Sequence, residues 1–73
     1  MDYEARKDVY EEYVYHFLYE SGNEYLFQNM KGEGWEQHVY YTLEQCNDDQ
    51  DLIKHAKEAA ACLIQEASEA IDV

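Results

Sequence analysis

Residues 48–71, DDQDLIKHAKEAAACLIQEASEAI, have the most regular pattern in the chain, and this stretch decides the fold. At about 100° per residue, its apolar side chains fall within one arc of roughly 120°. They are Leu52, Ile53, Ala56, Ala60, Leu63, Ile64, Ala67 and Ile71. No proline or glycine interrupts the run. The pattern predicts one amphipathic helix of about six turns, against which the rest of the chain packs.

The residues before this helix predict where it begins. Asn47, Asp48 and Asp49 have short side chains that accept hydrogen bonds from the free amides of a first turn. The two aspartates also place negative charge at the positive end of the helix dipole. We therefore expect the helix to begin at this group.

The first segment, from Asp2 to about Glu20, also favours a helix. Apolar residues come there as adjacent pairs that recur every four residues, whereas a strand would need alternation. The pairs are Val9 and Tyr10, Tyr13 and Val14, and Phe17 and Leu18. We expect Asp2 to cap the start of this helix and Gly22, in a left-handed conformation, to end it.

The middle of the chain fits two structures. Residues 24–31 can form two helical turns between Asn23 as cap and Gly32 as stop, or a strand. Farther on, one helical side carries Trp35, Val39, Leu43 and Cys46. The same stretch also alternates between two faces, as a strand would.

We expect an all-α fold, a small bundle of three longer helices plus one short helix. The alternative is an α+β fold, with an antiparallel hairpin of strands near 24–30 and 35–43, or a meander that begins at Tyr13, packed on the C-terminal helix. The helical fold is favoured because valine, isoleucine and threonine are few, while alanine, glutamate and glutamine are abundant.

Composition limits the class of protein. The 73 residues predict a single domain, 1–73, and 47% hydrophobic and 15% aromatic residues are too many for a disordered acidic tail. Lysine and arginine number 5 against 17 aspartates and glutamates, a formal charge of −12. Because affinity for nucleic acid comes largely from cations, we expect no direct binding to nucleic acid and a basic partner instead.

The sequence shows no membrane segment and no secretory signal. No apolar run approaches about 18 residues, and the start, MDYEARKD, lacks a basic and then apolar plan. We therefore expect a cytoplasmic protein without membrane partners.

Residues that could carry catalysis or bind metal are present without a useful spacing. His16, His38, His55, Cys46 and Cys62 contain no CxxC and no HxxxH. Neither cysteine has an obvious base beside it, and no glycine-rich phosphate loop occurs. We expect no enzyme activity, no catalytic residues, no metal and no cofactor, and we expect a bundle of this size to leave little room for a cleft.

The two cysteines provide a structural prediction. If the third and fourth segments form an antiparallel helical hairpin that turns at Asn47–Asp49, Cys46 and Cys62 lie roughly 20 Å apart, too far for a disulfide. Cys62 also lies outside the apolar arc, so we expect it to react with thiol reagents in the folded protein.

The surface supplies the functional hypothesis. Four tyrosines fall outside the apolar stripes and lie among acidic residues, and tyrosine is common in binding hot spots. The predicted partner-binding residues are Glu11, Glu12, Tyr15, Tyr19, Glu20, Glu36, Tyr40, Tyr41, Glu44, Asp48, Asp49 and Asp51.

These features favour a non-enzymatic acidic binding protein. We expect it to occupy a basic, nucleic-acid-binding surface of a partner protein and to inhibit that partner, as nucleic-acid mimics of the anti-restriction and anti-CRISPR type do. The alternative is a structural or assembly module that forms a helical homodimer through its surplus tyrosines. A metal site on the histidines is left as a third hypothesis.

Overall fold

The protein is a bundle of helices. The computed structural model describes the backbone of residues 2–32 and 34–71, and their side chains except those of 29–31 and 70–71. Helix α1 spans Tyr3–Glu20, the 3₁₀ helix η1 Glu24–Lys31, α2 Trp35–Gln45 and α3 Asp49–Ile71. The described residues contain no strand, so the all-α prediction is confirmed.

The α+β alternative is wrong. Residues 24–30 and 35–43 belong to helices and form no hairpin, and residues from Tyr13 onward continue α1 and form no meander. The deciding signals are the low β-propensity of these segments and the apolar residues that recur on one helical side of α2.

The ends of α1 follow the predicted capping. Asp2 Oδ1 accepts a hydrogen bond of 2.8 Å from the backbone N–H of Ala5. At the other end Gly22 has φ +76°, which a residue with a side chain rarely adopts. The backbone N–H of Gly22 donates to Tyr19 O, and that of Asn23 donates to Leu18 O, so the last carbonyls of the helix are satisfied in a Schellman motif.

The short helix η1 differs in detail from the expectation. Its Asn23 makes no capping hydrogen bond with its side chain, which instead donates to the backbone oxygen and the hydroxyl of Ser21. Gly32 ends η1 as predicted, with extended backbone at φ −77°. The asparagine therefore stabilises the turn after α1 rather than the start of η1.

Helix α3 begins where the sequence predicts. Asp48 Oδ1 accepts from the backbone N–H of Asp51, and Asp51 Oδ2 accepts from the backbone N–H of Asn47, each at 3.0 Å. Asp48 therefore caps the first turn of α3, while Asp51 accepts from the residue before the cap rather than from the cap itself, as it would in a full capping box. Two of the predicted partner-binding acids therefore have a structural role.

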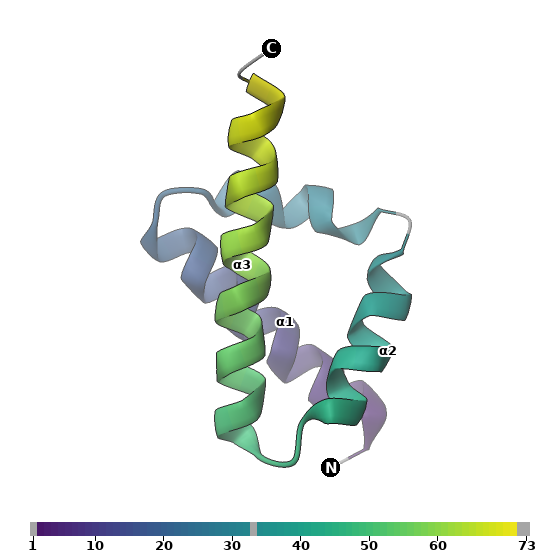
Figure 1. Cartoon of the computed structure of the whole chain (residues 1–73). Helices are drawn as coiled ribbons and strands as arrows, with labels where there is room; N and C mark the ends of the chain where they lie inside the picture. The colour runs from purple at the N-terminus through teal and green to yellow at the C-terminus, as the bar shows by residue number, and fades with distance from the viewer. Residues whose placement is uncertain (1, 33, 72–73) are drawn as a thin grey trace.

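Figure 1 shows how the helices are arranged. Helix α3 crosses in front of α1, and these two helices make the most extensive contact in the bundle. Helix α2 is joined to α3 by a tight turn, and from that turn the two helices diverge. The turn at residues 46–48 is thus where the predicted hairpin places it, but α2 and α3 do not pack against each other as an antiparallel pair.

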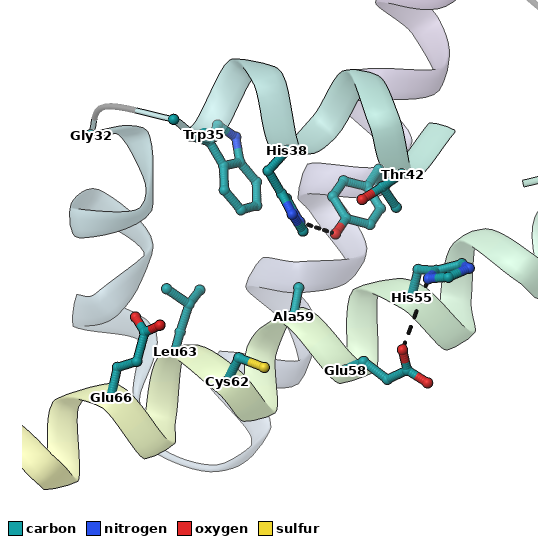
Figure 2. A pocket seen from close by; sticks show the side chains of 12 residues that line it. Gly32, Trp35, His38, Thr42, His55, Glu58, Ala59, Cys62, Leu63 and Glu66 are labelled. Atoms are coloured by element: carbon teal, nitrogen blue, oxygen red, sulfur yellow. Dashed lines mark hydrogen bonds and ion pairs between the residues drawn. The ribbon is translucent and has the colours of Figure 1, made fainter. Parts of the chain in front are cut away.

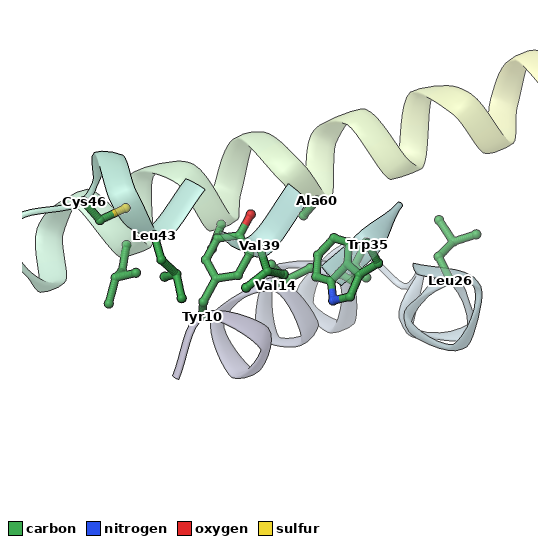
Figure 3. Close-up of a cluster of buried hydrophobic side chains, with 11 residues drawn as sticks. Tyr10, Val14, Leu26, Trp35, Val39, Leu43, Cys46 and Ala60 are labelled. Carbon is green, nitrogen blue, oxygen red and sulfur yellow. The ribbon is translucent and has the colours of Figure 1, made fainter. Parts of the chain in front are cut away.

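The core lies where the three predicted apolar sides meet (Figure 3). Each long helix contributes side chains spaced by three or four residues. The buried apolar residues are Tyr10, Val14 and Leu18 of α1, Leu26 of η1, Trp35, Val39 and Leu43 of α2, Cys46 of the turn, and Leu52, Ala56 and Ala60 of α3. Of the arc predicted for α3, Leu63, Ile64 and Ala67 are partly buried against this core, whereas the side chain of Ile71 lies outside the described residues.

Polar side chains of α1 attach α2 to the bundle. Arg6 Nη2 donates to Leu43 O at 3.0 Å and to Cys46 O at 2.8 Å, at the C-terminal end of α2. Lys7 forms an ion pair with Glu36 at the other end of α2. The positive charge of Arg6 therefore meets carbonyl oxygens at the negative end of a helix dipole.

Candidate functional site

One side of α1 carries a dense group of acidic and tyrosine side chains, which we call the acidic tyrosine face. At 100° per residue its members fall within an arc of roughly 100°, which borders on the arc of the residues that α1 contributes to the core. They are Glu4, Asp8, Glu11, Glu12, Tyr15 and Tyr19. All are exposed except Glu11, which is half-buried.

The aromatic part of this face is built on η1. Tyr15 is 42% exposed and Tyr19 61% exposed, with ring centroids 6.3 Å apart. Tyr15 also packs edge-on against Phe27 of η1, at a centroid distance of 5.0 Å and an interplanar angle of 81°. Open hollows of about 490 and 530 Å³ lie beside Tyr15, the first also lined by Tyr19 and the second by Phe27, and Glu12 borders both. The face therefore offers a supported aromatic anchor among carboxylates.

The other two predicted tyrosines lie elsewhere. Tyr40 and Tyr41 on α2 are 51% and 54% exposed, as expected for residues outside the apolar stripe. The centroids of their rings lie 5.9 Å apart, and the ring centroids of Tyr40 and Tyr3 lie 6.1 Å apart. Because Tyr3 and Tyr15 are separated by about 18 Å along α1, the predicted tyrosines form two groups rather than one.

Several of the predicted acids are engaged within the protein. Glu36 binds Lys7, Glu20 lies 2.7 Å from His16 Nε2, and Glu11 Oε2 accepts from Trp35 Nε1 at 2.8 Å. A hydrogen bond with Glu44 raises the pKa of Tyr40. Asp49 is exposed at the start of α3, beside the two capping aspartates. Of the twelve predicted residues, the acidic tyrosine face brings together Glu11, Glu12, Tyr15 and Tyr19.

A cleft of about 560 Å³ opens between α2 and α3, although a bundle of this size was expected to leave little room for one. It exists because α2 and α3 diverge from their connecting turn. Tyr10 of α1, which is fully buried, forms its base. The helical walls are formed by Trp35, His38 and Thr42 of α2 and by His55, Glu58, Ala59, Cys62, Leu63 and Glu66 of α3 (Figure 2).

The sequence contained a signal for this cleft that periodicity alone did not single out. The residues of each wall follow one line along their helix, at spacings of three or four. Trp35 and Leu63 belong to the apolar stripes, and the other wall residues lie beside them. Which helix such a line faces depends on the angle between helices, and the sequence does not specify this angle.

Tyr10 and His38 are joined by a hydrogen bond at the base of the cleft. Tyr10 Oη lies 2.9 Å from His38 Nε2. Burial raises the pKa of Tyr10 to about 12, although a hydrogen bond with Thr42 opposes this rise. Desolvation and the nearby His55 lower the pKa of His38. Both groups are therefore neutral at pH 7.

The cysteines have the predicted states. Both are free: Cys46 is buried and Cys62 is exposed. Cys46 Sγ donates to Thr42 O at 3.2 Å, and burial raises the pKa of this thiol. Cys62, on the wall of the cleft, is the accessible thiol.

The part of the chain that the structure describes contains no assembled metal site. No three histidine, cysteine, aspartate or glutamate side chains among these residues are grouped so that they could hold a metal ion. His55 Nδ1 lies 3.9 Å from Glu58 Oε2 on α3, and His16 pairs with Glu20 on α1. In the same described residues, no helix is long and apolar enough to cross a membrane.

Comparison with known proteins finds no protein-family model, no curated protein and no solved structure that matches this chain. Its function is therefore argued from its own residues.

Proposed function

We propose that this protein is a non-enzymatic acidic binding protein that places the acidic tyrosine face of α1 on a basic surface of a partner protein and inhibits it. The observation that carries the proposal is the grouping of four carboxylates and two exposed tyrosines on one side of a single helix. The helix fixes the backbone of these residues, so only their side chains need to be ordered when a partner binds.

The spacing of charge on this face suits mimicry of nucleic acid. Glu4, Asp8, Glu11 and Glu12 span nine residues, about 12 Å of helix, so the helix presents on average one carboxylate per about 4 Å of its length. A single strand of DNA carries one phosphate per about 3.4 Å of the duplex axis. A surface that has evolved to neutralise phosphates would therefore meet a comparable line of charge.

The distribution of cations supports the same proposal. Arg6 is directed into the bundle, where it binds backbone carbonyls, and Lys7 is paired with Glu36. Lys54 and Lys57 are exposed on α3. The net charge of −12 adds a long-range attraction for a basic partner, which speeds association at low salt.

The tyrosines supply the contact that charge alone does not. Tyr15 and Tyr19 present large, rigid, amphipathic rings beside the carboxylates, and the ring of Tyr15 is supported by Phe27. We expect these rings to enter the centre of the interface and the carboxylates to surround them.

The test is capture of partners from a native lysate, followed by competition with duplex DNA. The wild-type protein should retain proteins that bind nucleic acid, release them as salt rises, and lose them to added DNA. The triple variant Glu4→Lys, Asp8→Lys, Glu12→Lys should retain far less. The matched control, Glu24→Lys, Glu44→Lys, Glu69→Lys, makes the same change in net charge at exposed acids elsewhere and should retain the partner.

Three results would contradict the proposal. Capture could be independent of salt, it could resist competition by DNA, or the two triple variants could lose it equally. Each would show that the partner does not bind the carboxylates of the acidic tyrosine face.

The alternative, a homodimer formed through tyrosines, is favoured by a different surface. Tyr40, Tyr41 and Tyr3 form an exposed aromatic group on α2 and the start of α1. Sedimentation at several protein concentrations separates the two functions, since a dimer that Tyr40→Ala and Tyr41→Ala dissociate would support the assembly module. A net charge of −12 on each copy opposes such a dimer at low salt.

A further inference from the structure

We propose that the cleft between α2 and α3 binds a small aliphatic diamine or polyamine, with one ammonium group at Glu58 and another at Glu66. This site is separate from the acidic tyrosine face, because Tyr10 at its base projects from the opposite side of α1. It therefore goes beyond the function proposed above. The cleft, at about 560 Å³, has the size of small-molecule sites, which range from about 300 to 1,000 Å³.

The base of the cleft is rigid. Tyr10 is fully buried and Trp35 is 9% exposed, and their rings stack at a centroid distance of 6.1 Å. Trp35 also contacts the ring of His38 at 5.0 Å, and Glu11 holds the indole N–H. These contacts place the aromatic wall in position before any ligand enters.

The charge of the lining selects a cation. Glu58 and Glu66 are the acidic residues of the lining, and the lining contains no lysine or arginine among the described residues. His38 is neutral at pH 7 because desolvation and His55 lower its pKa, so its ring does not repel a cation. An anionic ligand would be repelled by both carboxylates and by the whole chain.

The spacing of the two carboxylates selects a ligand with two separated charges. Glu58 and Glu66 lie eight residues apart on α3, about 12 Å along the helix. Ala59, Cys62 and Leu63 lie between them on the same wall (Figure 2). A chain of methylene groups fits against these small or apolar side chains while its two ends meet the carboxylates.

The probe is 1,8-diaminooctane, and binding is followed by the fluorescence of Trp35, the single tryptophan of the chain. We expect a saturable change with the diamine. The neutral 1,8-octanediol, of the same length, and the shorter 1,4-diaminobutane should bind more weakly. The double variant Glu58→Gln, Glu66→Gln should weaken binding of the diamine by about tenfold or more, as expected when charge-assisted contacts are lost.

Two further measurements locate the ligand. In the wild-type protein the diamine should slow alkylation of Cys62 by N-ethylmaleimide, because this thiol lies on the cleft wall. The matched variant Glu12→Gln, Glu69→Gln, which has the same net charge, should bind the diamine normally. So should the triple lysine variant of the acidic tyrosine face, which distinguishes failure of this site from failure of the proposed function.

The proposal is overturned by any of four results. The diamine could cause no fluorescence change, the diol could bind as well as the diamine, the two glutamine variants could be weakened equally, or Cys62 could react at an unchanged rate with the diamine bound. The protection of Cys62 is measured on the wild-type protein, so it stands even where a variant unfolds.

Discussion

Arg6 allows the attachment of α2 to the bundle to be tested quantitatively. Its guanidinium donates two hydrogen bonds, to Leu43 O and Cys46 O, at 3.0 and 2.8 Å. A hydrogen bond to a charged group contributes about 1.5–3 kcal/mol, and both bonds here are part-buried, which favours the lower end of that range. We therefore expect Arg6→Ala to lower the free energy of unfolding by about 2–3 kcal/mol, a large share of the stability of a domain of this size.

The assay is urea denaturation followed by circular dichroism, with Lys57→Ala as the control. This control removes the same charge from an exposed position on α3 and should change stability by no more than about 0.5 kcal/mol. Arg6→Lys should recover only part of the loss, because a single ammonium keeps the charge at the end of α2 without the planar pair of donors. If Arg6→Ala and Lys57→Ala destabilise the protein equally, the reasoning about α2 is refuted.

Three further predictions follow from single residues. Burial raises the pKa of Tyr10 to about 12, so the unfolded chain releases this proton at a lower pH than the folded protein does. Between pH 10 and 12 the free energy of unfolding of the wild type should therefore fall by up to about 2–3 kcal/mol relative to that of Tyr10→Phe. Parallel curves of stability against pH for the two proteins would contradict this. In the native protein a maleimide should label Cys62 and spare Cys46, which is buried; equal labelling rates without denaturant would be the contrary result. Gly22→Ala should lower the free energy of unfolding by about 1 kcal/mol because φ is +76° there, although no atom lies within 4 Å of an added Cβ. Gly32→Ala, at φ −77°, should lower it by less in the same urea titration. Equal losses would show that the left-handed conformation is not the cause.

The helices were predictable because the apolar residues that each helix buries recur every three or four residues in the sequence. The pairs of apolar residues in α1 and the single line from Trp35 to Cys46 in α2 both became core. Local capping was predictable for the same reason, since Asp2 and Gly22 act on backbone groups within a few residues of themselves. Only the middle of the chain was ambiguous, because short apolar segments fit a strand as well as a helix.

The arrangement of the surfaces was much less predictable. The helical pattern correctly indicated that Tyr15 and Tyr40 leave the core, but it did not show that they belong to separate groups. Contacts such as Lys7 with Glu36 join residues far apart in the sequence, and nothing in the local pattern pairs them. The cleft depends on how far α2 tilts from α3, which is set by the packing of the whole bundle.

The way α2 is attached has a consequence for the motions of the protein. Helices α1 and α3 pack closely, whereas α2 makes a much less extensive contact with α1, through its buried Trp35, Val39 and Leu43 and through Arg6 and Lys7 of α1. Its 11 residues are also too few to be a stable helix in isolation. Partial unfolding should therefore begin with α2 and leave the α1–α3 pair intact. In amide hydrogen exchange, α2 would then open as a separate cooperative unit, at a lower free energy than its neighbours.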